Sequence, residues 1–177
     1  MPPARPAFGF TLWELLYAVA IAAVVLGLGV PALRDIALDA KRLAAVHSLV
    51  GSVRFARTEA QKRRRTIVLC ASFDLQSCAG VSDFTSGWIV FENTDGDQPP
   101  QRAAGERLLR VERPSLAGTA AANRAAFEFR PFPRRSTNGT IDYCDPRGDP
   151  QSRAVIVSYT GRPRIADATG GRCGGSS

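Results

Sequence analysis

Apolar residues form one uninterrupted run near the start of the chain. From Leu15 to Leu33 no residue is charged, and as a helix this stretch would be about 29 Å long. That length is enough to cross the hydrocarbon core of a bilayer. We therefore expect a hydrophobic membrane and assembly helix over residues 10–33. Pro31 predicts either local weakening of the helix or a simple bend near the membrane exit.

A periodic pattern replaces the continuous run after Arg34. Apolar residues recur mostly at three- and four-residue intervals with charged residues between them, namely at Ile36, Leu43, Val46, Val50, Val53 and Ala60. The spacing predicts one helix from about residue 11 to about 64, whose amphipathic half, 34–65, packs one face onto a domain. The basic run 62–65 falls at the helix end, where cations complement the helix dipole; phosphate binding is the alternative.

Short runs rich in β-branched and aromatic residues fill the rest of the chain, 66–177. They are "TIVLCAS", "GWIVFE", "RLLRVE", "AFEFRP", "TIDYC" and "AVIVSY", with Gly, Asn, Asp and Pro between them. This pattern is typical of antiparallel strands. An amphipathic helix followed only by strands predicts an α+β fold, with the helix lying across a sheet or small sandwich. We place Trp88 and Phe91 in the core.

The length of the chain limits the number of domains, and its net charge bears on the partners it can bind. A chain of 177 residues accommodates one globular domain with an appendage. The net charge of +7 at pH 7 comes almost wholly from arginine, because Lys41 and Lys62 are the only lysines. The planar guanidinium suits phosphate contact, but an arginine excess alone is a weak argument for nucleic-acid binding.

The polar residues form no catalytic or cofactor-binding constellation in the sequence. His47 is the single histidine, has no nucleophile in its local sequence, and falls on the helix surface. Asn93, Asp95 and Asp97 alternate as in calcium loops but lack the later glutamate, which favours a turn between strands. We expect a protein that is not an enzyme and that holds no cofactor and no metal.

Four cysteines, Cys70, Cys78, Cys144 and Cys173, follow the export-like apolar segment. An even number outside the cytosol predicts two disulfides, with three possible pairings. Pairing of neighbours, Cys70 with Cys78 and Cys144 with Cys173, is favoured because each bond closes a short loop bounded by turn residues. A zinc site is the alternative, although the cysteines lack the close paired spacing of zinc ribbons.

The segment "GFTLWELL" resembles the type III signal of type IV pilins and type II secretion pseudopilins. The resemblance implies a prepilin leader, 1–9, cleaved by the prepilin peptidase between Gly9 and Phe10, with methylation of the new amino terminus. It also implies that Glu14 pairs with the amino group of a neighbouring subunit during filament assembly. The partner would explain a carboxylate within an apolar run. A plain signal anchor with an incidental glutamate is the alternative.

Two further segments, "VRFARTEAQKRRRTIVLCAS" and "GWIVFENTDGD", resemble the FimT/GspH group of minor pilins and pseudopilins. With the leader and the helix, the resemblance covers roughly residues 8–97. It implies a single-pass inner-membrane protein with a periplasmic domain that later enters an extracellular pilus. The implied partners are other pilins, the prepilin peptidase and the inner membrane.

Near the carboxyl end, Gly161–Arg164 matches the G-R-x-R pattern of DNA-binding FimT-type minor pilins. Gly161 permits a tight turn, and Arg162 and Arg164 flank one extended residue, so both can contact neighbouring phosphates of one strand. A solvated turn is the alternative. Further arginines could extend the surface: Arg147, Arg153 and Arg172, and after them Arg130, Arg134 and Arg135.

The resemblance therefore implies a minor type IV pilin that binds double-stranded DNA through this basic surface, for DNA uptake in natural transformation. Such binding would be insensitive to sequence, since no recognition helix is available to read base edges. Two alternatives remain open. One is a GspH-like minor pseudopilin of a type II secretion system, and the other is a minor pilin that primes pilus assembly without touching DNA.

Overall fold

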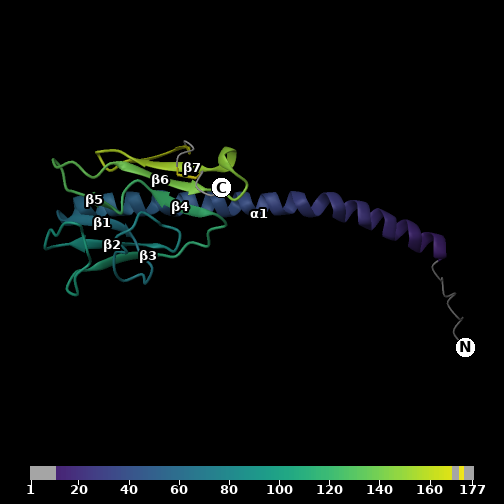
Figure 1. The fold of residues 1–177 in the computed structure, drawn as a ribbon, viewed down its shortest axis with the longest axis horizontal. Helices are drawn as coiled ribbons and strands as arrows, with labels where there is room; N and C mark the ends of the chain where they lie inside the picture. The colour runs from purple at the N-terminus through teal and green to yellow at the C-terminus, as the bar shows by residue number, and fades with distance from the viewer. Residues whose placement is uncertain (1–10, 169–171, 174–177) are drawn as a thin grey trace, which may run out of the picture. The chain divides into compact units, whose positions relative to one another are not determined.

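A computed structural model describes residues 11–168 and 172–173 (Figure 1). The chain divides into two compact units, residues 1–39 and 40–177. One long helix, α1 (Leu12–Arg63), precedes all the strands. The strands are β1 (Thr66–Ala71), β2 (Trp88–Asn93), β3 (Leu108–Glu112), β4 (Thr119–Ala122), β5 (Ala126–Phe129), β6 (Gly139–Cys144), β7 (Arg153–Val157) and β8 (Pro163–Asp167), with a short 3₁₀ helix, η1 (Asp149–Gln151), before β7. The α+β prediction is confirmed. The predicted processing site, Gly9 and Phe10, lies outside the described residues.

The amino-terminal end of α1 has a capped first turn. The Thr11 hydroxyl oxygen accepts a hydrogen bond from the Glu14 backbone amide over 3.3 Å. Thr11 and Glu14 thus have the spacing of a capping box, in which a carboxylate in the first turn also favours the helix dipole. Glu14 thus stands in the first turn, where a carboxylate favours helix initiation, and the assembly role that the resemblance implies is separate from this.

The predicted helix from residue 11 to 64 agrees with the observed bounds, and α1 continues through Pro31. Among the described residues, no helix is both long enough and apolar enough to cross a membrane. The first unit nevertheless exposes large apolar side chains, including Leu12, Trp13, Leu15, Leu16, Tyr17, Val19, Ile21, Val24, Val25 and Leu26.

The carboxyl-terminal end of α1 is stabilised by ion pairs, and the helix stops at a residue in the left-handed conformation. Arg63 pairs with Glu59 one turn earlier and lies 3.6 Å from Glu92 of β2. The hydrogen bond that the Arg63 guanidinium donates to the Glu59 carboxylate raises the pKa of Arg63. Arg64 then adopts φ 54°, which ends the helix. These contacts agree with the predicted role of the basic run as a helix cap.

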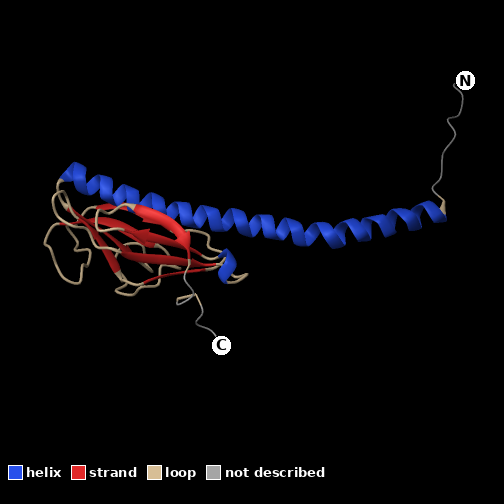
Figure 2. Ribbon diagram, turned by 90° about the horizontal axis from the view of Figure 1, so that it is seen from above, coloured by secondary structure: helices blue, strands red, loops and turns tan. Residues whose placement is uncertain are grey.

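Within the second unit, the carboxyl-terminal part of α1 lies along the strands (Figure 2). Its buried apolar residues are Ala45, Val46, Leu49, Val50, Val53, Ala56 and Ala60. The apolar face predicted from the sequence was wrong at Leu43, which is 58% exposed, and at Ile36, which is 65% exposed. Within the second unit, the buried part of this apolar stripe begins at Ala45. His47 is exposed, as expected.

The strands form two antiparallel four-stranded sheets, ordered β3-β2-β1-β5 and β4-β6-β7-β8. The six runs identified in the sequence correspond to β1, β2, β3, β5, β6 and β7. Two strands were not predicted. β4 has the sequence TAAA, whose alanines have low strand propensity. β8 begins with Pro163, which is tolerated there because the strand lies at a sheet edge.

The core joins the helix to both sheets. Its largest fully buried side chains include Trp88, Phe84, Phe127, Phe129 and Tyr143. The Trp88 indole donates a buried hydrogen bond of 2.9 Å to the Ser52 hydroxyl on α1, so the polar end of the ring is paired. Phe91 is also fully buried, in a second cluster with Cys70 and Cys78. The core positions predicted for Trp88 and Phe91 are confirmed.

The cysteines pair as the loop lengths predict. Cys70 is bonded to Cys78, and Cys144 is bonded to Cys173. The first bond closes the loop after β1, and the second ties the carboxyl-terminal segment to the end of β6. Each bond restricts the unfolded chain and so stabilises the fold.

The acidic segment after β2 folds as a turn. The Asn93 side-chain oxygen accepts a hydrogen bond from the Gly96 amide over 2.7 Å, and its side-chain nitrogen donates to Asp97 over 2.9 Å. Asp97 in turn accepts from the Gln101 amide over 2.7 Å. The side chains of Asn93 and Asp97 thus stabilise a connection between strands, as predicted from the missing glutamate.

Candidate functional site

The predicted G-R-x-R segment forms the turn between β7 and β8. The Gly161 amide donates to the Ser158 carbonyl over 2.8 Å, and the Ser158 amide donates to the Arg162 carbonyl over 3.1 Å. Gly161 has φ 71°, a left-handed conformation that glycine adopts without strain. The turn that the sequence predicted at Gly161 is therefore present, and Arg164 lies inside the unpredicted edge strand β8.

Gly161 also lies at a close contact between three segments. A Cβ atom at this position would lie 3.1 Å from Phe129 Cδ1, 3.2 Å from Arg57 Cδ and 3.3 Å from Ser136 Oγ. These distances are tighter than ordinary van der Waals contact. The absence of a side chain at Gly161 therefore lets the β7–β8 turn pack against α1 and against the loop between β5 and β6.

Hydrogen bonds fix the loop between β5 and β6, residues 130–138, to its neighbours. The Ser136 amide donates to the Tyr159 carbonyl in the β7–β8 turn over 2.9 Å. On the other side, Gln61 of α1 accepts from the Phe132 amide over 3.1 Å and donates to the Arg130 carbonyl over 3.3 Å. The loop is thus held at both ends before any ligand arrives.

The β7–β8 turn is also tied directly to α1. The Arg57 Nε donates to the Thr160 carbonyl over 2.8 Å. This bond uses the guanidinium as a donor but leaves its charge uncompensated. Three segments far apart in the sequence are thereby joined: the last turns of α1, the β5–β6 loop and the β7–β8 turn.

These three segments enclose an open groove of about 560 Å³, here named the arginine groove. It is lined by Arg57, Gln61, Arg130, Phe132, Pro133, Arg134, Arg135, Ser136, Tyr159, Thr160 and Arg162. Five of these lining residues are arginines, and none is an aspartate or glutamate. The groove therefore presents concentrated positive charge, which attracts anions, and phosphate above all.

Most of the positive charge in the arginine groove is not neutralised. Arg130 is the exception, because its Nη2 lies 2.7 Å from the Glu128 carboxylate. Within the described part of the chain, no carboxylate pairs with Arg134, Arg135 or Arg162, and all three side chains are exposed. Arg135 instead lies over the Tyr159 ring, 5.6 Å from its centre.

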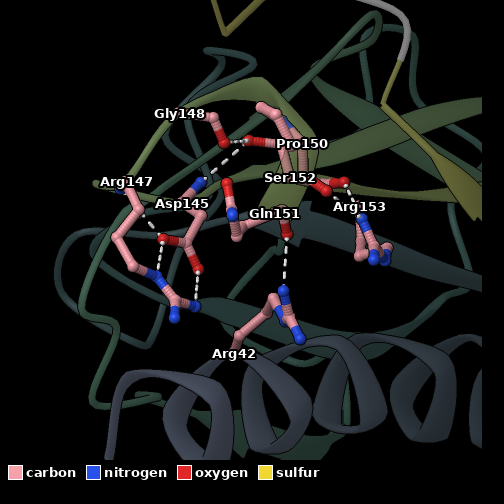
Figure 3. Close-up of polar contacts among 8 residues, drawn as sticks. All are labelled: Arg42, Asp145, Arg147, Gly148, Pro150, Gln151, Ser152 and Arg153. Atoms are coloured by element: carbon pink, nitrogen blue, oxygen red, sulfur yellow. Dashed lines mark hydrogen bonds and ion pairs between the residues drawn. The ribbon is translucent and has the colours of Figure 1, made fainter. Parts of the chain in front are cut away.

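Arg147, one of the arginines proposed to extend the surface, belongs to a separate network (Figure 3). Its guanidinium donates to both oxygens of Asp145, over 2.9 and 3.0 Å. The hydrogen bond from Arg147 holds the pKa of the buried Asp145 carboxyl below its ordinary value, against the effect of burial. Nearby, Arg42 of α1 donates to the Gln151 carbonyl over 3.2 Å and anchors this loop.

Arg153 and Arg172 also have acidic partners. Arg153 lies 3.2 Å from Asp167 of β8 and donates to two backbone carbonyls, as Figure 3 shows for the Ser152 carbonyl. Arg172 pairs with Asp142, a buried residue of β6. The structure thus does not bring Arg147, Arg153 or Arg172 to the arginine groove.

Arg164 is exposed on β8, where it lies opposite Ile156, and it does not line the groove. The structure therefore groups Arg162 with Arg130, Arg134 and Arg135, with Arg164 on the adjoining strand. The sequence did not predict the participation of Arg57, Gln61, Phe132 or Tyr159. One signal was present: in "RPFPRR" a phenylalanine between two prolines stands beside paired arginines, which is unusual for a core position.

The sequence matches the family model for type II transport protein GspH over residues 45–161. The chain is a member of the GspH family. The matched segment runs from the buried part of α1 to the β7–β8 turn, so this GspH-family domain includes most of the arginine groove. No curated protein matches the chain.

Solved structures of a minor pilin share the fold of this GspH-family chain. Two crystal forms of the type IV minor pilin FimU from Pseudomonas aeruginosa strain PAO1 match it with TM-scores of 0.53 and 0.54. The sequence identity is 21% in both, over 70% of this chain and 91% or 87% of FimU. The chain is thus of the GspH type and has the fold of a minor pilin. Proteins of this type assemble with other pilins in a filament and are not enzymes.

Proposed function

We propose that this chain is a minor type IV pilin that holds double-stranded DNA by its phosphates, without sequence preference, for DNA uptake in natural transformation. The binding surface comprises the arginine groove and the adjoining Arg164 on β8. The observation that carries the proposal is the composition of the groove, since the described residues that line it include five arginines and no acidic residue.

The surface suits a polyanion because its cations are accessible and its backbone is fixed. Arg134, Arg135 and Arg162 are exposed, and the segments that carry them are hydrogen-bonded to each other through Ser136 and Tyr159. Binding therefore requires little ordering of the protein. Contacts to phosphate release counterions, so affinity should fall steeply as salt is raised.

The assembly part of the proposal rests on the amino-terminal segment. Cleavage between Gly9 and Phe10 would produce the mature subunit, anchored in the inner membrane until it enters the filament. The exposed apolar side chains of the first unit, such as Leu15 and Val25, need a lipid or protein environment. Glu14 would then pair with the amino terminus of a neighbouring subunit.

A second candidate function is favoured by the description of the matching family, type II transport. In that case the chain is a minor pseudopilin of a type II secretion system, and its groove contacts another pseudopilin or an exported protein. Genes for pilus assembly and competence beside the gene would favour DNA uptake, whereas genes for secretion components would favour the pseudopilin.

Duplex binding over a salt series tests the proposal. The full chain is purified in a neutral detergent, and fluorescence anisotropy measures its affinity for a duplex of random sequence. The R162Q/R164Q variant should bind more weakly, and the slope of log K against log salt should flatten by about 0.9 for each lost phosphate contact. Arg107→Gln with Arg113→Gln is the matched control.

The control removes the same charge from exposed residues that flank β3, away from the arginine groove. Its affinity and salt slope should stay close to those of the original chain. If the two double variants weaken binding equally, only the net charge matters and the groove is not the site. If the original chain does not bind duplex DNA at all, the pseudopilin function takes precedence.

A further inference from the structure

The arginine groove combines its cations with two exposed aromatic rings. Phe132 is 84% exposed and Tyr159 is 54% exposed, and both line the groove. Duplex DNA offers such rings no base face to stack on, because the faces of its bases are stacked against each other inside the helix. An exposed aromatic ring beside arginines is instead typical of proteins that bind unpaired nucleotides, whose bases stack on the ring.

Phe132 is exposed although its backbone is fixed. Its amide donates to Gln61 of α1, and the following loop is held by the bond from Ser136 to Tyr159. The ring is therefore presented to solvent by an anchored backbone. Leaving a phenylalanine ring in water sacrifices the stabilisation that burial of its apolar surface would provide.

Tyr159 differs from Phe132 because the Arg135 side chain covers one face of its ring. The Arg135 guanidinium lies 5.6 Å from the centre of the Tyr159 ring, in a cation–π arrangement. This contact holds the Arg135 guanidinium beside the ring. A phosphate bound by Arg135 would thus bring the neighbouring base toward an aromatic surface, as binding of a single strand requires.

We propose that the arginine groove binds single-stranded DNA, with a base stacked on Phe132 and the strand's phosphates held by Arg57, Arg134, Arg135 and Arg162. The inference rests on the proposed function, since both use the same arginines. It differs in the form of the nucleic acid, because it adds contact with unpaired bases to contact with phosphates. Stacking accepts every base, so it preserves binding without sequence preference.

The test compares ligands that differ only in their bases. The full chain in neutral detergent is titrated with a fluorescently labelled oligothymidylate and with an abasic strand of equal length, which keeps the phosphates but has no bases. The original chain should bind oligothymidylate at least about fivefold more tightly, the low end for one stacked base. F132A should remove this preference, and F132W should retain it.

The matched control is F73A. Phe73 is 56% exposed but does not line the groove, so its loss should leave the preference unchanged. A 2-aminopurine base in a single strand provides a second readout, because stacking quenches its fluorescence. The quenching should appear with the original chain and with F132W, and should be absent with F132A.

Each result distinguishes the two proposals. Equal affinity for the thymidylate and abasic strands would overturn the stacking proposal and leave phosphate binding intact. No affinity for any nucleic acid, duplex included, would overturn the proposed function and the stacking proposal together. A base preference that survives F132A would place the stacking surface elsewhere and would also overturn this inference.

Discussion

The Phe132 backbone amide donates a hydrogen bond to the Gln61 side-chain oxygen over 3.1 Å, which ties the β5–β6 loop to the last turns of α1. The same side chain donates to the Arg130 carbonyl over 3.3 Å. Gln61 thus closes a bridge to the backbone on both sides of Pro131. This bridge holds one wall of the arginine groove without placing any charge in it.

Gln61→Ala should weaken DNA binding although it removes no charge. Without the bridge, the β5–β6 loop must be ordered when DNA binds, and ordering costs about 0.5–1.5 kcal/mol for each immobilised side chain. We expect a loss of affinity of about two- to tenfold, measured by anisotropy at constant salt. Gln101→Ala, at an exposed position outside the groove, should have no effect. Equal losses in both variants would contradict a role for the bridge.

Gly161→Ala should destabilise the domain and weaken DNA binding together. The residue has φ 71°, and its new Cβ would lie 3.1–3.3 Å from Phe129, Arg57 and Ser136. Gly96→Ala is the matched control, because Gly96 has φ 72° and open space around it. Both variants carry backbone strain of about 1–3 kcal/mol, and only the first also displaces its neighbours. Urea unfolding should therefore show a larger loss for Gly161→Ala, and equal losses would mean that the close contact is unimportant.

Asp145→Asn should lower the stability at neutral pH, and the loss should shrink in acid. The pKa of Asp145 is lowered in the fold, chiefly by its hydrogen bonds from Arg147. Its stabilising contribution is therefore complete above the unfolded pKa, about 3.9, and is lost as the pH falls through the lower folded pKa. We expect a difference of about 1–3 kcal/mol at pH 7, measured by urea unfolding over a pH series.

The exposed Asp149 in the same loop provides the control for this experiment. Asp149→Asn should change the free energy of unfolding by less than about 0.5 kcal/mol at pH 7. A difference between the original chain and Asp145→Asn that stays constant from pH 7 down to pH 2 would contradict the ion pair with Arg147 as its cause.

Glu14→Ala should block incorporation into filaments while the domain from Ala40 onward stays folded. The expected cause is loss of the carboxylate partner for a neighbouring subunit's amino terminus. Immunoblots of sheared filaments measure incorporation. Thr11→Ala separates this role from helix capping, because it removes the oxygen that accepts from the Glu14 amide and keeps the carboxylate. If Thr11→Ala blocks incorporation equally, capping explains the effect.

Several elements could be predicted from the sequence because their causes are local. The period of apolar residues determined α1, the β-branched runs determined six strands, and the short loops determined the pairing of Cys70 with Cys78 and of Cys144 with Cys173. Periodicity predicted buried positions at Ile36 and Leu43, and both side chains are exposed. The spacing of apolar residues shows which face of a helix is apolar, but it does not show how much of that face is buried.

The sequence by itself thus determined the fold class, the helix and most strands, the disulfides and the glycine turn before Arg162, since each depends on neighbours along the chain. Only the tertiary structure decided which arginines lie together. Arg147, Arg153 and Arg172 are paired with carboxylates that the sequence does not identify, whereas packing brings Arg57, the β5–β6 loop and the β7–β8 turn to one groove. The reason is physical: charge compensation and base stacking depend on distances through space, and those distances are set by how α1 and the two sheets pack.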